Sequence, residues 1–355
     1  MRADASWRDT AMAVLARYDL SVRALARIPQ GLINLTLRVE AGAGERFVLQ
    51  RLHAVFGDSV NANLLQVTAH LRRAGLMTPE LIRTRAGALS VAMPDGLWRL
   101  LSFVDGQALD ALAHAQQARA AGDLLGRFHA ALGDFDAELA CDRPPVHDLD
   151  RHLIHLAAVR DRQAAHPHAA RVDDLAARLA TLLPRVSPFC RSPLRLTHGD
   201  PKISNVLFDA AGMHALCLID LDTLAYMPLA YELGDALRSW CNPASEDAAD
   251  AHFDLLLFEA AIEGYCTAAR GFVTRAEIAA IVPATLAVYL ELAARFLADA
   301  LDERYFAWDS ARYAGRAEHN LARAQGQLAA CASLIAQRAQ AEAVVAACLD
   351  MLPST

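Results

Sequence analysis

The sequence predicts an α+β protein with a small β-rich N-terminal lobe and a larger, mainly helical C-terminal lobe. Two observations lead to this bilobal class. The first hundred residues hold strand-like apolar segments with Gly-containing turns, and Ala-rich segments with helical spacing dominate after Asp105-Gly106. The chain has 355 residues and is 54% hydrophobic, enough for a sizeable core. We expect one lobe over 1–104 and the other over 105–355.

Two β-hairpins are expected in the N-terminal lobe. The first joins LTLRVEA (35–41) to ERFVLQRL (45–52) through the turn AGAG, where glycine supplies the positive φ of a tight turn. The second pairs GALSVAM with LWRLLSFV across the Pro-Asp-Gly turn at 94–96. Helical spacing predicts a helix at 60–75 and a short amphipathic helix at the N-terminus.

The C-terminal lobe is expected to consist of helices that are interrupted once. Within 194–222, two short apolar runs lie on either side of a turn, in LRLTHGDPKISNVLFD and ALCLIDLD, and predict a β-hairpin. The Ala-rich segments predict helices over about 115–133, 148–165, 171–183, 246–270, 275–302 and 313–348.

Composition excludes several classes of protein. A formal net charge of −7 without a basic run argues against a nucleic-acid partner. No segment approaches the roughly 18 uninterrupted apolar residues of a membrane span, and the N-terminus lacks the apolar stretch of a signal peptide. The seven cysteines are far apart and form no CxxC, which argues against a zinc site or a disulfide framework. We expect a cytoplasmic protein with no membrane partner.

The chain has a single lysine among 34 basic residues, and it lies in HGDPKISN (198–205). Phosphoryl transfer from Mg-ATP needs an acid to orient and deprotonate the attacking hydroxyl, an amide and a carboxylate on the metal, and a cation on the phosphates. Asp200, Lys202, Asn205 and Asp220 follow the order that protein kinases use for these groups, and the first three also match the spacing. A compact ammonium beside the γ-phosphate is one interpretation of the exception to Arg, and a solvated loop lysine is the other.

These segments resemble the aminoglycoside phosphotransferase/choline kinase superfamily, whose members have a protein-kinase-like fold. The resemblance rests on HGDPKISNVLFD, CLIDLDTL and YELGDALR. It is closest to the N-acetylhexosamine 1-kinases through GLINLTLRVE, FVLQRLH, ARFLADAL with a Tyr-Phe soon after, and HNLARAQ, so the matches cover most of the chain.

The resemblance implies roles for individual residues and ATP with Mg²⁺ as cofactors. Asp200 is implied as the catalytic base on the acceptor, and Asn205 and Asp220 as magnesium ligands. The implied nucleotide contacts are Asn34 near the phosphates, Arg51, and the backbone of Ser102, Phe103 and Val104 at the adenine. The implied sugar contacts are Arg295 and Tyr305.

The N-terminal lobe departs from the superfamily pattern. The third strand of most such kinases carries a Lys that grips the α- and β-phosphates, and FVLQRLH offers Gln50 and Arg51 instead. Strand alternation puts these two side chains on opposite faces, so orientation decides whether Arg51 serves. No Glu between 54 and 79 is present to pair with such a cation, and the phosphate loop has one glycine, Gly31.

Other polar residues near the motif have simpler interpretations. We expect His198 to brace the loop and Asp235 to cap or brace its helix through hydrogen bonds. Asp222 has two open roles, a second metal contact or a cap for the following loop. His152 and His155 are three apart on an expected helix, but no third ligand is nearby in sequence, so we expect no metal there.

The predicted function is transfer of the ATP γ-phosphate to a sugar hydroxyl, specifically the anomeric hydroxyl of an N-acetylhexosamine. The first alternative is a kinase for an aminoglycoside, choline, homoserine or methylthioribose. Four late acids would suit a cationic acceptor: Glu291, Asp299, Asp302 and Glu303. The departure around Gln50 motivates a second alternative, a nucleotide-binding regulatory protein. A third is a metal hydrolase built on His198, Asp200, Asp220 and Asp222.

Overall fold

The structure is a computed structural model that describes residues 3–28, 34–42, 44–140, 147–189 and 191–352. The chain divides into two compact units. Unit 1 comprises Met1–Asp105 with Phe135–Asp142, and unit 2 comprises Gly106–Asp134 with Arg143–Thr355.

The segment that begins at Phe135 belongs to unit 1, although the sequence placed it in the C-terminal lobe. The backbone N–H of Ala140 donates to the side chain of Asn63 at 2.6 Å. Phe135 makes an edge-on ring contact with His70 at 5.3 Å. Both Asn63 and His70 lie on one helix, α2 (Ser59–Arg73), which therefore anchors the segment.

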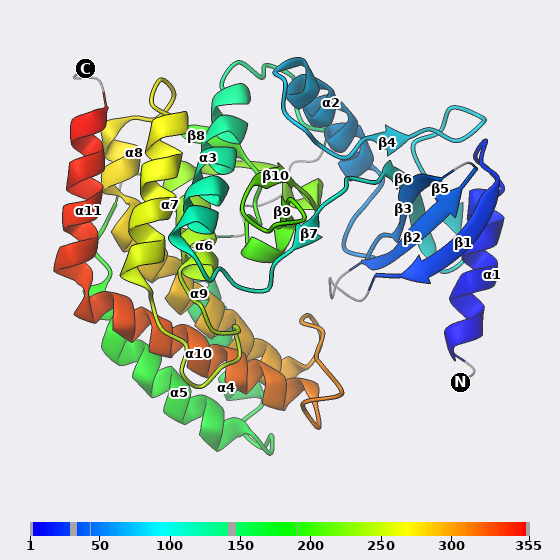
Figure 1. The fold of residues 1–355 in the computed structure, drawn as a ribbon. Helices are drawn as coiled ribbons and strands as arrows, with labels where there is room; N and C mark the ends of the chain where they lie inside the picture. The colour runs from blue at the N-terminus through cyan, green and yellow to red at the C-terminus, as the bar shows by residue number, and fades with distance from the viewer. Residues whose placement is uncertain (1–2, 29–33, 43, 141–146, 190, 353–355) are drawn as a thin grey trace. The chain divides into compact units, whose positions relative to one another are not determined.

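Unit 1 is an antiparallel sheet with the N-terminal helix α1 (Ala3–Leu15) on one face (Figure 1). Val14 and Leu15 of α1 share a core with Leu49 and Trp98 of the sheet. The strand order is β1-β2-β3-β6-β4, and β5 also pairs with β6. The strands are β1 (Val22–Arg27), β2 (Leu35–Ala41), β3 (Glu45–Arg51), β4 (Leu81–Ile82), β5 (Val91–Met93) and β6 (Gly96–Ser102).

Both predicted hairpins are confirmed, as is the helix predicted at 60–75, which is α2. In the first hairpin Leu37 lies opposite Leu49, and in the second Val91 lies opposite Trp98. The strand β1 was not predicted individually. It is half-buried to exposed and carries two arginines, so its apolar alternation is weak.

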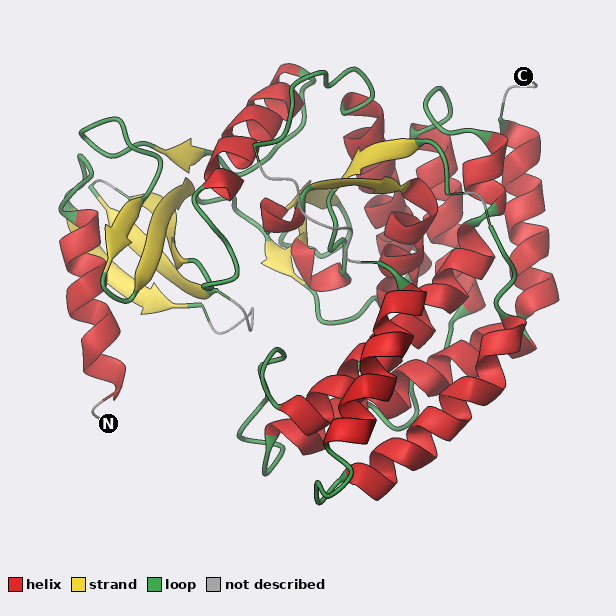
Figure 2. Ribbon diagram, turned by 180° about the vertical axis from the view of Figure 1, so that it is seen from behind, coloured by secondary structure: helices red, strands yellow, loops and turns green. Residues whose placement is uncertain are grey.

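Unit 2 is mainly helical (Figure 2), and nearly all residues of α9 (Ile281–Asp302) are buried, so α9 is its core helix. By length and composition α9 could cross a membrane, but 94% of its apolar window is buried inside the protein. The other helices are α3 (Ala115–Ala131), α4 (Leu149–Arg162), α5 (Ala169–Leu182), α6 (Leu229–Trp240), α7 (Leu255–Ala268), α8 (Arg275–Ala279), α10 (Arg316–Ala336) and α11 (Arg338–Met351).

Three predicted helices have different bounds in the structure. The helix predicted at 246–270 starts later, because Asp254 caps α7 by accepting from the N–H of Leu257. The helix predicted at 275–302 breaks at Ala280, and Pro283 in the first turn of α9 cannot continue the hydrogen bonds of α8. The helix predicted at 313–348 turns at Gln337, where no Gly or Pro marks the break.

Two small antiparallel sheets carry the HGDPKISN region in unit 2. One has the order β10-β9-β7 and the other pairs β11 with β8. The hairpin of β9 and β10 was predicted, whereas β7 and β11 were not. The strands are β7 (Gln107–Ala108), β8 (Leu194–Thr197), β9 (Val206–Phe208), β10 (Ala215–Leu218) and β11 (Ala225–Pro228).

Candidate active site

One buried carboxylate supports the loop between β8 and β9. Glu232 of α6 is fully buried, and it accepts hydrogen bonds from the backbone N–H of His198 (2.8 Å) and of Gly199 (2.9 Å). The ring of His129 lies 3.3 Å from the same carboxylate. Gly199 has a φ of +85°, and a Cβ there would lie 2.1 Å from the carbonyl oxygen of Thr223. The loop therefore requires both a glycine and a buried acceptor.

The imidazole of His198 braces this loop, as predicted. It is fully buried, with Nε2 2.9 Å from the carbonyl oxygen of Ile219 and Nδ1 3.3 Å from the backbone N–H of Asp200. A carbonyl only accepts and an amide N–H only donates, so the ring is neutral with its proton on Nε2. Both nitrogens are thus engaged within the loop, which argues against His198 as a metal ligand and against the hydrolase hypothesis.

Asp200, Lys202 and Asn205 form one hydrogen-bonded group. Lys202 Nζ lies 2.5 Å from Asp200 Oδ2, and Asn205 Nδ2 donates to the same oxygen at 3.2 Å and to the Asp200 carbonyl at 2.8 Å. Partial burial lowers the pKa of the Lys202 ammonium, but Asp200 and Asp220 outweigh it and keep that pKa above its usual value. Lys202 and Asn205 both donate to Oδ2 of Asp200. Its other carboxylate oxygen, Oδ1, is therefore the one that could take a proton from the hydroxyl of a substrate.

Asp220 follows β10 in a left-handed conformation, with φ 64° and ψ 52°. That conformation is uncommon for a residue with a side chain and clusters at functional sites. The backbone N–H of Ile219 donates to the carbonyl of Asn205 at 2.9 Å and joins this turn to the loop. Because Asn205 uses Nδ2 on Asp200, its Oδ1 is the atom available to a cation.

The donor set fits a hard divalent cation. Asn205 and Asp220 offer amide and carboxylate oxygens, which Mg²⁺ prefers. Within the described ranges, no three His, Cys, Asp or Glu side chains form a group that could hold a metal ion. A pair of oxygen ligands is typical of Mg²⁺ sites, because Mg²⁺ keeps several waters and takes further oxygens from substrate phosphates. The role of Asp222, which is buried beside this turn, stays a prediction.

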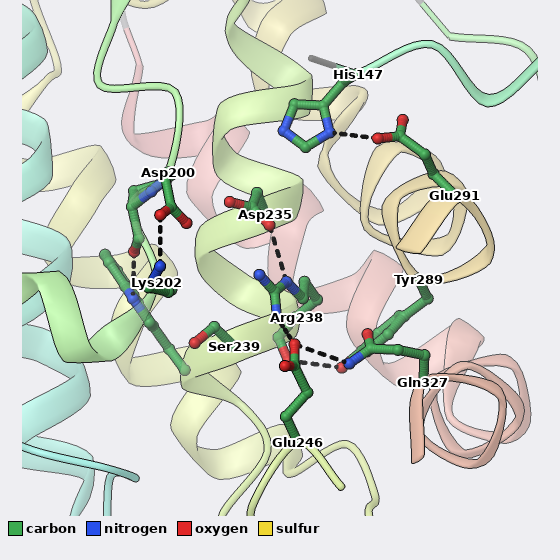
Figure 3. A network of polar contacts seen from close by, with 12 residues as sticks. His147, Asp200, Lys202, Asp235, Arg238, Ser239, Glu246, Tyr289, Glu291 and Gln327 are labelled. Atoms are coloured by element: carbon green, nitrogen blue, oxygen red, sulfur yellow. Dashed lines mark hydrogen bonds and ion pairs between the residues drawn. The ribbon is translucent and has the colours of Figure 1, made fainter. Parts of the chain in front are cut away.

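Asp235 braces α6 beneath the loop, as predicted (Figure 3). Its carboxylate accepts from Arg238 Nε at 2.8 Å, and Arg238 also contacts Glu246 at 2.8 Å. Burial raises the pKa of Asp235, but the positive charges of Arg238, His147 and Lys202 outweigh it and hold that pKa below its usual value. In Figure 3, Asp235 lies between Asp200 and His147.

The two residues predicted to contact a sugar lie together at the end of α9. The guanidinium of Arg295 is 5.9 Å from the ring centre of Tyr305 and 3.7 Å from Glu291. Asp299 fixes the following segment by accepting from the backbone N–H groups of 304–306. Tyr305 is 53% exposed, so this corner of unit 2 presents an accessible aromatic ring beside a cation.

In unit 1, Arg51 lies on the face of the sheet that α1 covers. Its guanidinium contacts Asp95 at 3.1 Å and is 5.9 Å from the ring centre of Trp98. Trp98 and Leu49, two residues before Arg51 on the same strand, belong to the core shared with α1. Alternation along β3 places Gln50 on the opposite face.

A second, buried cation lies on the Gln50 face. Arg99 is 1% exposed and pairs with Gln50 in the β3–β6 register. Its Nε and Nη2 donate to Gln50 Oε1 at 3.0 and 2.7 Å, and Nη1 donates to Asn61 of α2 at 3.3 Å. Amide side chains on β3 and α2 thus hold an arginine where the resemblance implies a Lys–Glu pair. Sequence reasoning missed Arg99 because cross-strand pairing, not a motif, brings it there.

The remaining nucleotide-contact candidates also lie in unit 1. The backbone N–H of Ser102 donates to the Glu80 carbonyl at 2.8 Å, and the Ser102 hydroxyl accepts from the Glu80 backbone N–H at 2.8 Å. The N–H of Phe103 donates to the carbonyl of Arg46 at 3.3 Å. The contact of the Ser102–Val104 backbone with adenine stays a prediction.

The side chain of Asn34 tethers the start of β2 to the end of β3. Its Oδ1 accepts from the backbone N–H of His53 at 2.8 Å. Gly31, the single glycine of the predicted phosphate loop, lies outside the described residues.

Comparisons with known proteins agree with this geometry. Residues 24–269 match the phosphotransferase enzyme family (APH). A homoserine kinase from Methylobacterium sp. (strain 4-46) is 28% identical over 232 residues, which cover 64% of this chain and 68% of that protein. The N-acetylhexosamine branch of the predicted resemblance is not singled out by these matches and stays a prediction.

Two solved structures are similar to the whole fold. An amicoumacin kinase solved with AMP-PNP and Ca²⁺ superposes with a TM-score of 0.60 at 15% identity, covering 88% of this chain and 94% of that one. A microcompartment-associated aminopropanol kinase superposes with a TM-score of 0.58 at 17% identity, covering 95% and 98%. These likenesses confirm the predicted α+β kinase-like fold. Because the family match spans more than half of the chain, this protein belongs to the phosphotransferase enzyme family.

Proposed function

We propose that this small-molecule phosphotransferase moves the γ-phosphate of ATP, with Mg²⁺, to a hydroxyl of a neutral sugar, and specifically to the anomeric hydroxyl of an N-acetylhexosamine. The observation that carries the phosphotransfer is the hydrogen-bonded group of Asp200, Lys202 and Asn205 beside Asp220. Family membership implies ATP and a divalent cation. Use of ATP suits the predicted cytoplasmic location.

Asp200 is the proposed base. As the acceptor oxygen bonds to the γ-phosphorus and the bond from phosphorus to the ADP oxygen breaks, the hydroxyl proton passes to Oδ1 of Asp200. Lys202 holds the other carboxylate oxygen and keeps Asp200 oriented. Mg²⁺, held by Asn205 and Asp220, supplies charge neutralisation on the phosphate oxygens when bound.

Unit 1 supplies the proposed nucleotide contacts. The backbone of Ser102–Val104 pairs with the base, and Asn34 lies near the phosphates. The cation on the phosphates is Arg51, from the resemblance, or Arg99, which lies on the other face of the same sheet beside α2. A pair of matched variants separates these two cations, as set out in the Discussion.

A neutral acceptor is favoured by the state of the late acids. A cationic acceptor needs carboxylates whose charge is free to bind it, yet each of the four acids already has at least one partner within unit 2, although Oε2 of Glu291 has none among the described residues. These partners are Arg295 for Glu291, the backbone N–H groups of 304–306 for Asp299, Arg162 for Asp302 and His166 for Glu303. Arg295 and Tyr305 are then positioned to contact a sugar by hydrogen bonding and stacking.

A second candidate is a kinase for homoserine or an amino alcohol. It is supported by the 28% identity to a homoserine kinase and by the fold likeness to an aminopropanol kinase. The same loop would serve, and only the acceptor would differ. A regulatory nucleotide-binding protein is the third possibility, motivated by the unusual Gln50–Arg99 pairing.

The test is acceptor-dependent ADP release with Mg-ATP across N-acetylglucosamine, N-acetylgalactosamine, plain hexoses, homoserine, aminopropanol and choline. We expect the fastest turnover on the N-acetylhexosamines, with an anomeric phosphate in the phosphorus NMR spectrum of the product. Turnover confined to homoserine or amino alcohols would keep the chemistry and replace the substrate. Tight nucleotide binding without turnover on any acceptor would favour the regulatory function.

A further inference from the structure

Glu291 and His147 form a buried pair in unit 2 with two unused polar atoms. Glu291 is fully buried, and its Oε1 lies 3.1 Å from His147 Nδ1. The same oxygen is 3.7 Å from Arg295 and 3.8 Å from His152. The second carboxylate oxygen, Oε2, and the second ring nitrogen of His147, Nε2, have no hydrogen-bond partner in the described structure.

Such a pair needs partners that the folded chain does not supply. A buried polar atom without a hydrogen bond is destabilising, and more so when the group is charged. All the basic groups around Glu291 lie nearest to Oε1, so Oε2 lacks a donor. A hydroxyl or amide N–H of a bound molecule is a donor of the right kind. His147 Nε2, on the adjoining group, is suited to a neighbouring polar atom of that molecule.

An aromatic ring and a cation flank the Glu291–His147 pair. The ring of Tyr231, on α6, stacks on His147 at 5.7 Å with an angle of 12°. Arg295, one turn along α9 from Glu291, connects the pair to the exposed Tyr305. Figure 3 shows Asp235 on α6 with Asp200 on one side and His147 on the other. Asp235 feels the charges of both His147 and Lys202, so the pair lies within electrostatic reach of the catalytic loop.

We propose that Glu291 and His147 recognise the acceptor, with Glu291 Oε2 accepting from one acceptor hydroxyl or amide N–H and His147 Nε2 bonding to the polar group next to it. The proposal rests on the proposed function and deepens it. Arg295 and His152, whose side chains are 15% and 17% exposed, form the edge over which the acceptor enters. The charge of Glu291 is already offset by its neighbours, so the pair selects a neutral, multiply hydroxylated acceptor rather than a cation.

Two variants test the pair. Glu291→Gln keeps the shape and removes the charged acceptor atom, and we expect the acceptor KM to rise about 10–100-fold, as for loss of a hydrogen bond to a charged group. His147→Asn retains an N–H at the position of Nδ1 for Glu291 but removes Nε2, and we expect about a tenfold rise. The KM for ATP and the kcat at saturating acceptor should not change.

Asp302→Asn is the matched control on the same helix, because Asp302 pairs with Arg162 at 2.7 Å and should leave the acceptor KM unchanged. A shift in melting temperature with an unchanged acceptor KM in both test variants would show that a buried water alone satisfies the pair, and would overturn the proposal. If Glu291→Gln raised the KM for amine acceptors alone, the proposal that Glu291 recognises a neutral group would be wrong. If the wild-type protein phosphorylates nothing in the acceptor panel, the proposed function itself fails, and this inference falls with it.

Discussion

The catalytic loop of unit 2 and the central strands of unit 1 differ in how their polar groups are held. In the loop, Asp200, Lys202 and Asn205 are close in sequence, and they contact one another directly. In unit 1, the buried cation Arg99 reaches Gln50 across two strands that are distant in sequence. The arrangement in the loop therefore follows from spacing within one short segment, whereas the Gln50–Arg99 arrangement depends on strand register.

After the loss of Asp200 itself, the largest expected effect comes from removing a proposed metal ligand on the loop side of this comparison. Asp220→Asn should lower kcat by about 10²–10³-fold, because charge on the transferring phosphate loses its counter-ion. It should also raise the Mg²⁺ concentration needed for half-maximal rate. Asp222→Asn is the matched variant two residues away. A similar magnesium shift in Asp222→Asn would assign Asp222 to the metal, and no shift in either variant would contradict the proposed site.

Next in size is the loss of the support beneath the loop. Glu232→Ala leaves the buried N–H groups of His198 and Gly199 without an acceptor, and each should cost about 1–3 kcal/mol of unfolding free energy. Urea denaturation measures this loss. Glu259→Gln, an exposed acid on α7, should change the unfolding free energy by less than about 0.5 kcal/mol. Equal stability of the two variants would show that Glu232 does not hold the loop.

A smaller effect is expected on the unit 1 side, where Arg99→Gln and Arg51→Gln compare the two faces of the sheet. We expect Arg99→Gln to weaken ADP binding by about tenfold or more, because Arg99 lies on the face shared with α2. Arg51→Gln should have less effect, since Arg51 is turned to Asp95 on the α1 face. Calorimetric titration measures both, with melting temperature as the check on folding. The reverse ranking would return the phosphate contact to Arg51.

The smallest expected effect is a pH dependence of stability at His147. Burial lowers the pKa of His147, but Glu291 and Asp235 outweigh burial and the charge of Arg295, so that pKa is raised above its usual value. A raised pKa stabilises the fold fully below about pH 6.5, the unfolded value, and the contribution disappears as pH rises through the folded value. The stability gap between wild type and His147→Asn should therefore be larger at pH 6 than at pH 9. A gap that grows with pH would contradict this.

The features that the sequence predicts are those set within one short segment, and the features it misses depend on contacts between distant segments. The spacing in HGDPKISN and the turn chemistry of the hairpins are local, so the loop and both hairpins are predicted with their residues. Glu232 was visible in YELGDALR, but only burial shows that an acid there accepts two backbone N–H groups. The pairing of Arg99 with Gln50 depends on strand register, which no local pattern specifies.

The acceptor end shows the same limit. Arg295 and Tyr305 were predicted from resemblance, and the structure brings them together. His147 was one of many histidines without a pattern, and only its contact with Glu291, far along the chain, makes it a candidate. Contacts between residues so distant in sequence are set by helix packing rather than by spacing.

The central claim is that the loop of unit 2 performs phosphoryl transfer whatever cation unit 1 supplies. Acceptor-dependent ADP release at saturating Mg-ATP by Asp200→Asn, compared with wild type, tests it most directly. We predict a fall of about 10²–10⁴-fold in kcat with nucleotide affinity retained, as expected when a general base is removed. A variant that turns over at the wild-type rate would contradict the assignment of Asp200 and, with it, the account of the loop.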